Sequence, residues 1–503
     1  MDNVRAKRLK LNMVVSVVLQ VASFISGMII PHILLLTFGS KVYGLTSSVS
    51  HFLSFISFGE LGIGAVIQYN LYKPLYEKNW IEVSAVISSA KNFFDKLLVA
   101  IVFYVAILTI CLPFRFSDDF SFLYTASLII SMSVSYLARY FLAMAYRQLI
   151  DAEALSYIRI IPQIISIIIN VGATYALVSL GVSIQIIELI SSLIFILQPV
   201  VIVVYTKKHF PEINTSVKYQ GEPIKQKWNG LALHIANVIN RNTDTLVLTL
   251  FSTLESVSIY SVYYMIVSGI LIIIENTLNN FTAIFGNLIA KENYKEADNL
   301  LNDTEIGTHF FITIIFLCVA RLSVPFVEVY TYGVKDAQYS QPLFAYLLAI
   351  AYALFCYRIP YHVFIKAAGH YKQTQKAAII EAATNIVVSV ILVANFGVIG
   401  VAIGTISAMG YKTIYYILYL RNNIINRSIK KSIKVFLADI VCVCVSWLLV
   451  STFKMSDVSY ASWIVLALKV FCVCTISCCT VYLLLYKNRV INIFYKLISR
   501  NTR

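Results

Sequence analysis

The sequence predicts an all-α polytopic membrane protein with about fourteen transmembrane helices, and three observations lead to this fold class. The chain of 503 residues is 59% hydrophobic and only 13% charged, with a mean hydropathy of +0.78. Apolar runs of about 20 residues recur along its whole length, and each is long enough to cross the hydrocarbon core of a bilayer. Basic residues gather in every second loop, as they do in membrane proteins with a fixed orientation.

Short polar loops separate the apolar runs and define the expected spans. The first follows a basic N-terminal segment without a small-residue cleavage site, so it is expected to be a retained helix and not a signal peptide. Several runs exceed the bilayer thickness, and tilted helices are therefore expected. The spans lie near 13–36, 42–68, 94–113, 120–146, 157–178, 184–205, 229–251, 256–284, 306–330, 342–366, 378–396, 398–420, 435–453 and 459–486.

The loop charges predict the orientation of the chain. One set of loops carries 29 Lys and Arg residues, whereas the alternate set carries only Lys41, Arg115, Lys335 and Lys454. The positive-inside rule places both termini in the cytoplasm and requires an even number of spans. The net charge of +15 therefore reports topology and contact with anionic lipid, and nucleic acid is not an expected partner.

The chain divides into related halves. The longest loop, 206–228, is basic, contains two prolines, and falls between the sixth and seventh spans. We therefore expect an N-terminal lobe over 1–205, a cytoplasmic linker over 206–228, a C-terminal lobe over 229–434, and two further spans with a cytoplasmic tail over 435–503. Segment 157–182 aligns without gaps to 376–401 at an offset of 219, which indicates a parallel repeat about an axis along the membrane normal.

The span 229–251 is unusually polar for a membrane helix. His234, Asn237, Arg241 and Asp244 follow one another at helical spacing and form one stripe, and Asn240 lies in the same segment. A charge at the centre of a membrane helix costs about 2.5–3.5 kcal/mol. The stripe is therefore expected to face a watery cavity. For Asp244 three roles are open, namely binding sugar, carrying a proton and holding Arg241.

Two further arginines lie within predicted spans and share the repeat offset. Arg139 and Arg358 are related by the same offset as the aligned segments, and each lies toward the cytoplasmic end of its helix. This correspondence favours a place for both at the interface of the halves, while the alternative is a purely structural pairing or snorkelling to the headgroups. Arg159 and Lys412 lie near predicted span ends and are expected to be interfacial.

Acidic residues inside the spans are candidates for ion coupling. Glu60 lies late in the second span between glycines, Glu275 lies deep in the eighth, and Glu381 lies early in the eleventh. A buried carboxyl group with a raised pKa can carry a proton or cation. Each could equally pair with an arginine in the membrane, and the sequence does not decide between these roles.

The sequence offers no constellation for enzymatic chemistry. It contains no P-loop, no H-E-x-x-H motif and no C-x-x-C motif. The nine cysteines all lie in apolar segments without histidine or carboxylate at ligand spacing, so they are interpreted as small packing side chains. No metal, no cofactor and no catalytic residue is therefore expected, apart from a coupling H⁺ or Na⁺.

Four stretches of the chain resemble a known family. They are PHILLLTFGSKVYG after the first helix, GELGIGAVIQYNLYKPL closing the second span, NRNTDTLVLTLFSTLESVSIYSVYYMI opening the second half, and AAGHYKQTQKAAIIEAATNIVVSVILVANFGVIGVAIG over 367–404. They resemble bacterial polysaccharide flippases of the Wzx type. These proteins belong to the multidrug/oligosaccharidyl-lipid/polysaccharide (MOP) exporter superfamily. The resemblance covers nearly the whole chain.

The resemblance implies two six-helix lobes related by a pseudo-two-fold axis, with two additional helices, in the bacterial inner membrane. It implies alternating-access transfer of an undecaprenyl-pyrophosphate-linked oligosaccharide to the outer leaflet, for O-antigen or capsule synthesis. By location, Arg139, Arg241 and Arg358 would meet the pyrophosphate, because Arg binds phosphate oxygens in bidentate fashion. Asn237, Asn240 and Asp244 would contact sugars.

The expected assembly is a monomer in contact with membrane lipids, with a polysaccharide polymerase and a chain-length regulator as candidate partners. The alternative function is a cation-coupled small-molecule or multidrug exporter of the same superfamily. Abundant intramembrane arginine and the last two spans favour the flippase. A membrane polymerase or acyltransferase is not expected, because the outer loops are only a few residues long and carry no catalytic set.

Overall fold

The computed structural model of the chain describes residues 2–60, 63–215 and 231–500, and it describes side chains for 5–57, 63–215, 239 and 242–486. Within these ranges all regular structure is helical, which confirms the predicted all-α fold class. The chain divides into two compact units, Met1–Val238 and Ile239–Arg503. The division falls within a helix, shortly after the predicted linker. Residues 216–228 of that linker lie outside the described residues.

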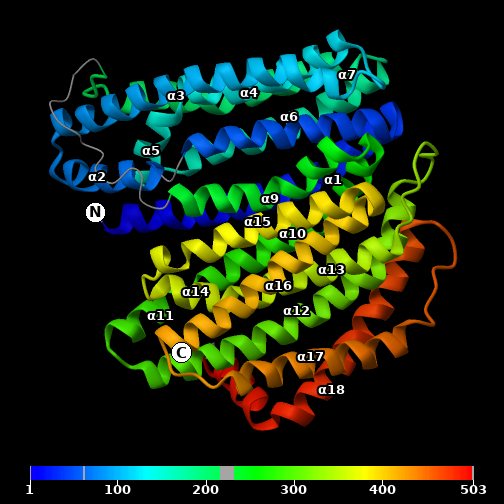
Figure 1. Cartoon of the computed structure of the whole chain (residues 1–503). Coiled ribbons are helices and arrows are strands. Elements are labelled where there is room, and N and C mark those ends of the chain that lie inside the picture. The colour runs from blue at the N-terminus through cyan, green and yellow to red at the C-terminus, as the bar shows by residue number, and fades with distance from the viewer. Residues whose placement is uncertain (1, 61–62, 216–230, 501–503) are drawn as a thin grey trace. The chain divides into compact units, whose positions relative to one another are not determined.

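The first unit contains eight α-helices and a 3₁₀ turn among its described residues (Figure 1). The long α1 bends at Gly39, whose φ of 81° is open to glycine and strained for other residues. This bend separates the first two predicted spans. The elements are α1 (Asp2–Ser54), η1 (Phe55–Glu60), α2 (Ile63–Glu77), α3 (Trp80–Arg115), α4 (Phe122–Leu142), α5 (Met144–Ala152), α6 (Tyr157–Ser179), α7 (Ile184–Phe195) and α8 (Leu197–His209).

The second unit begins within α9 and includes the C-terminal hairpin, which packs on α12 (Figure 1). Its helices are α9 (Leu231–Phe251), α10 (Leu254–Asn279), α11 (Phe281–Ala290), α12 (Tyr294–Tyr330), α13 (Pro342–Tyr357), α14 (Ile359–Ala367), α15 (Tyr371–Phe396), α16 (Val398–Asn423), α17 (Ile429–Val450) and α18 (Tyr460–Arg500). The predicted C-terminal segment 435–503 is thus part of this unit.

Twelve helical segments of the described chain are long and apolar enough to cross a membrane. Each coincides with a predicted span, and paired helices such as α13 and α14 form one segment broken by a kink. The two remaining predicted spans, 42–68 and 229–251, fall on the stretch after the Gly39 bend and on α9. The chain is therefore a multi-pass helical membrane protein.

The helix boundaries repeat between the units, but in a different register from the predicted one. The short helices α5 and α14 correspond and contain nine residues each, and the long helices α3 and α12 correspond in the same register. Positive φ angles recur at Lys78 and Glu292 and at Gly181 and Gly397. The predicted offset is wrong by about one helical turn, because it aligned Gly181 with Gly400, which lies inside α16.

The repeat is also visible in how two long helices start. Asn79 and Asn293 are the N-caps of α3 and α12, and each side chain accepts a hydrogen bond from the backbone N–H three residues on. Each Asn amide also donates to the side chain of that third residue, Glu82 at 3.2 Å and Glu296 at 2.6 Å. These reciprocal bonds satisfy helix-end groups that would otherwise lack partners.

Helices α15 and α16 form a closely packed hairpin in the second unit (Figure 1). Gly397 forms the turn with a φ of 52°. A Cβ atom at Gly404 would overlap Ser389 Oγ and would lie 2.9 Å from the Ser389 backbone nitrogen. Glycine therefore lets the two helices approach closely enough for polar side chains between them to meet.

A buried polar network attaches the C-terminal hairpin to α12. Asp439 of α17 accepts hydrogen bonds from Thr313 of α12 at 2.8 Å and from Tyr482 of α18 at 2.6 Å. Its second oxygen lies 2.6 Å from His309 Nδ1, and His309 stacks on Tyr357 with ring centroids 4.3 Å apart. Because these groups are buried, the hydrogen bonds between them help to hold the hairpin on α12.

We predict opposite effects for alanine at two glycines of α16. Gly404→Ala should lower the free energy of unfolding by about 1–3 kcal/mol, because the new Cβ overlaps atoms of α15. Gly410→Ala, the matched control, meets nothing within 4 Å and should stabilise α16 by up to about 1 kcal/mol through helix propensity. Thermal unfolding in detergent measures both. Equal melting temperatures for the two variants would refute the close approach at Gly404.

Candidate functional site

Three charged side chains meet in the interior of the second unit. Arg358 and Lys412 each donate to Glu381, one to each carboxylate oxygen, and the Lys412 Nζ to Glu381 Oε2 distance is 2.5 Å. Arg358 is 6% exposed, Lys412 is 3% exposed and Glu381 is fully buried. The pairing is required, because an unpaired charge in this interior would lose its hydration without compensation.

The chain path explains why these residues meet. Glu381 and Lys412 lie at nearly equal distances along the chain before and after the Gly397 turn, so the two side chains lie at the same depth of the α15–α16 hairpin. Arg358 sits where α13 ends and α14 begins. Pro360 in the first turn of α14 suits a helix start and breaks the preceding helix.

This cluster carries more positive than negative charge. Two bases contact one carboxylate, so the group has a formal charge of +1 when all three are ionised. Aromatic faces support the bases, with the Arg358 guanidinium 4.5 Å from the Phe355 ring centroid and Lys412 Nζ 5.6 Å from that of Tyr416. The arrangement favours binding of an anion that can compete with Glu381 for its two partners.

A second carboxylate lies close by with a different kind of environment. Asp244 of α9 is 4% exposed and accepts from the Tyr260 hydroxyl at 2.7 Å and the Thr405 hydroxyl at 2.8 Å. Asn385 Nδ2 donates to its other oxygen at 3.1 Å. These described partners are all uncharged, so nothing among them neutralises the carboxylate.

Helix α15 joins the two clusters. Glu381 and Asn385 are four residues apart and therefore lie on one face, and Ser389 continues the same face one turn on. The Ser389 hydroxyl donates to Asn385 Oδ1 at 3.1 Å. A continuous buried polar stripe thus runs between α15 and α16, with the cationic cluster at one end and Asp244 beside its middle.

The structure brings together only some of the predicted site residues. Arg358, Glu381 and Asp244 lie on this stripe. Glu275 of α10 is half-buried and lies near Cys356, two residues before Arg358. Arg139 belongs to the first unit, where its guanidinium lies 5.8 Å from the Tyr136 ring centroid and the side chain is half-buried. The side chains of Glu60, Asn237, Asn240 and Arg241 lie outside the described residues.

The sequence did not predict the position of Lys412 or the hydrogen-bond partners of Asp244. Lys412 was expected at the membrane interface, but it is buried and bound to Glu381, so that prediction is wrong. Counting residues on either side of the Gly397 turn would have paired it with Glu381. No comparable signal marks Tyr260, Asn385 or Thr405, because polar uncharged residues recur throughout the spans.

Comparison with solved structures identifies the fold. A lipid II flippase, MurJ, in an inward closed conformation matches with a TM-score of 0.67 and 17% identity over 94% of this chain and 100% of that one. An inward-facing multidrug resistance MATE transporter of the MOP superfamily matches with a TM-score of 0.60 and 12% identity over 79% and 94%. The chain has the fold of MOP-superfamily transporters.

A third solved structure, a eukaryotic MATE transporter, has this fold as well, with a TM-score of 0.52 and 12% identity over 86% of this chain and 99% of that one. No protein-family model matches the chain, and no curated protein sequence matches it. The predicted superfamily fold is therefore confirmed, whereas the Wzx type stays a prediction.

We predict that Glu381→Gln destabilises the protein strongly. The variant leaves Arg358 and Lys412 facing each other without a carboxylate, and breaking such a buried pair costs about 3–5 kcal/mol. The double variant with Glu381→Gln and Lys412→Met lacks one of the two bases, and it should recover part of the lost free energy of unfolding. Thermal unfolding in lipid nanodiscs reports both effects, and a single variant as stable as the wild type would contradict the charge pairing.

Proposed function

We propose that this protein is a flippase that moves an undecaprenyl-pyrophosphate-linked oligosaccharide from the cytoplasmic to the outer leaflet of the bacterial inner membrane. The observation that carries the proposal is the buried cluster of two bases and one carboxylate at Arg358, Lys412 and Glu381. A pyrophosphate is a multivalent anion, and its passage through hydrocarbon is prohibitive unless cations accompany it.

When no substrate is bound, Glu381 binds the basic groups that would otherwise bind the substrate's phosphate. Its two oxygens occupy the donors of Arg358 and Lys412, and phosphate oxygens offer the same bidentate acceptor geometry to a guanidinium. A substrate that reaches this end of the stripe exchanges with Glu381 for the two bases. The exchange costs little, because each base passes from one anionic partner to another.

The structural match to the MurJ flippase extends into the C-terminal hairpin. It covers 94% of this chain, and the part left uncovered is shorter than α17 and α18 together. The matches to the two MATE transporters cover 79% and 86% of this chain. The hairpin is fixed to α12 by the Asp439 network, as expected for a working part of the unit.

Asp244 is the proposed coupling group. Its oxygens meet a phenol, a hydroxyl and an amide, and these neutral groups can surround either a protonated carboxyl or a monovalent cation bound to a carboxylate. Glu381 is less suited to this task, because both of its oxygens already accept from bases. Binding of H⁺ or Na⁺ at Asp244 would couple transport to the gradient of that ion.

The proposal also includes the orientation of the chain, further substrate contacts and the assembly. Both termini lie in the cytoplasm, as the loop charges predict, and Arg139 and Arg241 add cations for the pyrophosphate. Asn237 and Asn240 contact the sugars. The protein acts as a monomer beside a polysaccharide polymerase and a chain-length regulator.

A cation-coupled small-molecule exporter is the second candidate, and the Asp244 cluster is the observation that favours it. That cluster needs no phosphate to explain it, and the MATE transporters share the fold. If the protein is an exporter, a strain that lacks its gene should lose drug resistance and keep its surface glycan. A flippase would show the opposite pattern.

Loss of the Arg358 guanidinium should abolish surface polysaccharide. Arg358→Ala removes a charge-assisted contact of about 1.5–3 kcal/mol to phosphate, so surface polysaccharide should fall about tenfold or more, while Arg358→Lys should retain part of it. The matched control is Lys469→Ala, which removes an exposed mid-helix lysine of α18. Immunoblots of glycan and of membrane-inserted protein measure the result, and wild-type glycan with Arg358→Ala would contradict the assignment.

Substitution of Asp244 should remove an ion-dependent gain in stability. A cation present at about 100 times its dissociation constant stabilises the folded state by about 2.7 kcal/mol. The melting temperature of the wild type should therefore rise with Na⁺ at fixed ionic strength, or with acid if H⁺ is the ion. Asp244→Asn should abolish the rise and Glu275→Gln should retain it. A wild type insensitive to both ions would refute the coupling role.

A further inference from the structure

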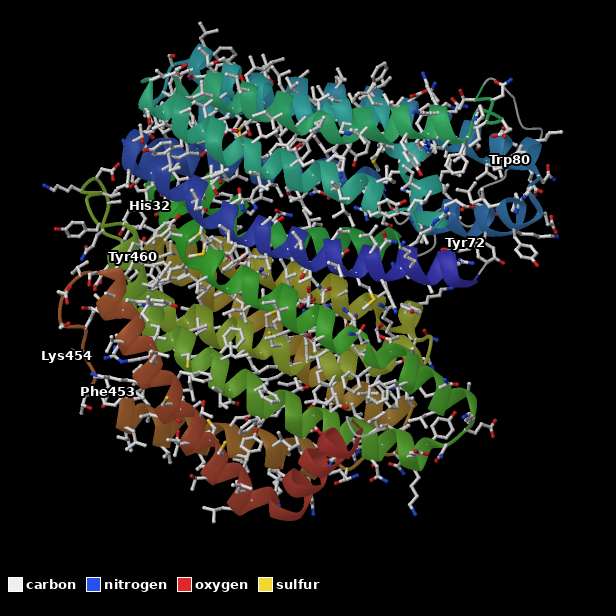
Figure 2. The ribbon with its side chains drawn as sticks, turned by 180° about the vertical axis from the view of Figure 1, so that it is seen from behind. His32, Tyr72, Trp80, Phe453, Lys454 and Tyr460 are labelled. Carbon is white, nitrogen blue, oxygen red and sulfur yellow. The ribbon has the colours of Figure 1, made fainter. Side chains whose placement is uncertain are left out.

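A cavity of about 380 Å³ lies at one end of the second unit, away from the polar stripe. It is enclosed by the last turns of α12, the first turns of α13, the connection between α17 and α18, and Leu466 of α18. Figure 2 shows Phe453 and Lys454 on this connection and Tyr460 where α18 begins. The loop charges predict that this end faces the outside of the cell.

The lining of the cavity includes basic groups. Arg321 of α12 donates to the backbone oxygens of Val450, at 3.3 Å, and of Phe453, which places its guanidinium at the C-terminus of α17. These bonds cap the helix and hold the side chain in one orientation. Lys454, four residues after Val450, adds an exposed ammonium group that forms no ion pair within the described chain.

The lining also includes acidic groups. Glu328 of α12 is half-buried and accepts a hydrogen bond from the Ser340 hydroxyl at 2.9 Å. Hydrogen bonds from Ser459, Ser462 and Ser456 hold the pKa of the Asp457 carboxyl below its usual value, and the Ser456 hydroxyl donates at 2.8 Å. Within the described chain neither carboxylate pairs with a base, so both present a negative charge to the cavity.

The lining of the cavity is also partly apolar, because Val324, Pro325 and Leu466 contribute side chains to it. Leu343 follows the lining residue Pro342 in α13 and is 55% exposed. The cavity therefore combines charged groups of both signs with apolar side chains that an aliphatic chain can contact.

We propose that this cavity binds the zwitterionic headgroup of a phospholipid of the phosphatidylethanolamine class. Glu328 and Asp457 accept hydrogen bonds from the ammonium group, and Lys454 and Arg321 face the phosphate. A primary ammonium suits two carboxylates better than a quaternary one, because it donates three hydrogen bonds. A phosphodiester without an amine would leave both carboxylates unpaired, so anionic lipids are disfavoured.

Native mass spectrometry of the purified full-length protein tests this site. The detergent-solubilised protein is titrated with short-chain phosphatidylethanolamine, phosphatidylglycerol and phosphatidylcholine, and with glycerophosphoethanolamine, which has the headgroup without acyl chains. Phosphatidylethanolamine should bind about fivefold more tightly than either other lipid, since one exposed charged contact contributes up to about 1 kcal/mol. Glycerophosphoethanolamine should bind more weakly than the lipid.

Variants assign the binding to the cavity. Glu328→Gln and Lys454→Gln should each weaken phosphatidylethanolamine binding about fivefold. Asp336→Asn and Lys335→Gln change residues of the α12–α13 connection that do not line the cavity, and they should bind like the wild type. Gel filtration checks that all four remain folded.

Three outcomes would overturn the proposal. They are equal affinity for phosphatidylethanolamine and phosphatidylglycerol, unchanged binding in both cavity variants, and binding of glycerophosphoethanolamine as tight as that of the lipid. The last would identify a soluble zwitterion as the ligand. None of these outcomes bears on translocation, so this test is independent of the proposed flippase activity.

Discussion

The second unit is organised by the requirement that charges buried among membrane helices find partners there. In a medium of low dielectric constant an isolated ion is far costlier than a paired one. Glu381 satisfies two bases at once, Arg358 from the α13–α14 break and Lys412 from α16. The Gly397 turn places Glu381 and Lys412 at one depth, and Gly404 lets their helices approach. The helix break at Arg358 and the two glycines thus allow Glu381 to pair with both bases.

Two carboxylates beside the same polar stripe have opposite environments. Glu381 faces two bases, which is the basis for its proposed exchange with an anionic substrate. Asp244 faces neutral donors among the described residues, which is the basis for its proposed role in ion coupling. Asn385 lies on the same helix as Glu381 and donates to Asp244, so α15 connects the two carboxylates.

Much of the fold follows from the sequence, because membrane spans are set by apolar length and basic loops, and both are local signals. The site follows only in part. Arg358 and Glu381 stand out as charges within apolar runs, whereas Lys412 lies near a span end and looks interfacial until its distance from Gly397 is compared with that of Glu381. Two glycines, Gly397 and Gly400, made the repeat register ambiguous, and only the backbone conformation identifies the one that forms the turn.

We propose that the cationic end of the stripe carries a pyrophosphate-linked lipid across the bilayer under an ion gradient. The most direct measurement is translocation in proteoliposomes that contain the purified protein and a fluorescent undecaprenyl-pyrophosphate oligosaccharide, with a pH or Na⁺ gradient imposed. For a flippase, the labelled glycan should appear in the opposite leaflet in a gradient-dependent manner, and excess unlabelled pyrophosphate lipid should inhibit its appearance. A protein that leaves this lipid in place but transports cationic drugs under the same gradient would contradict it.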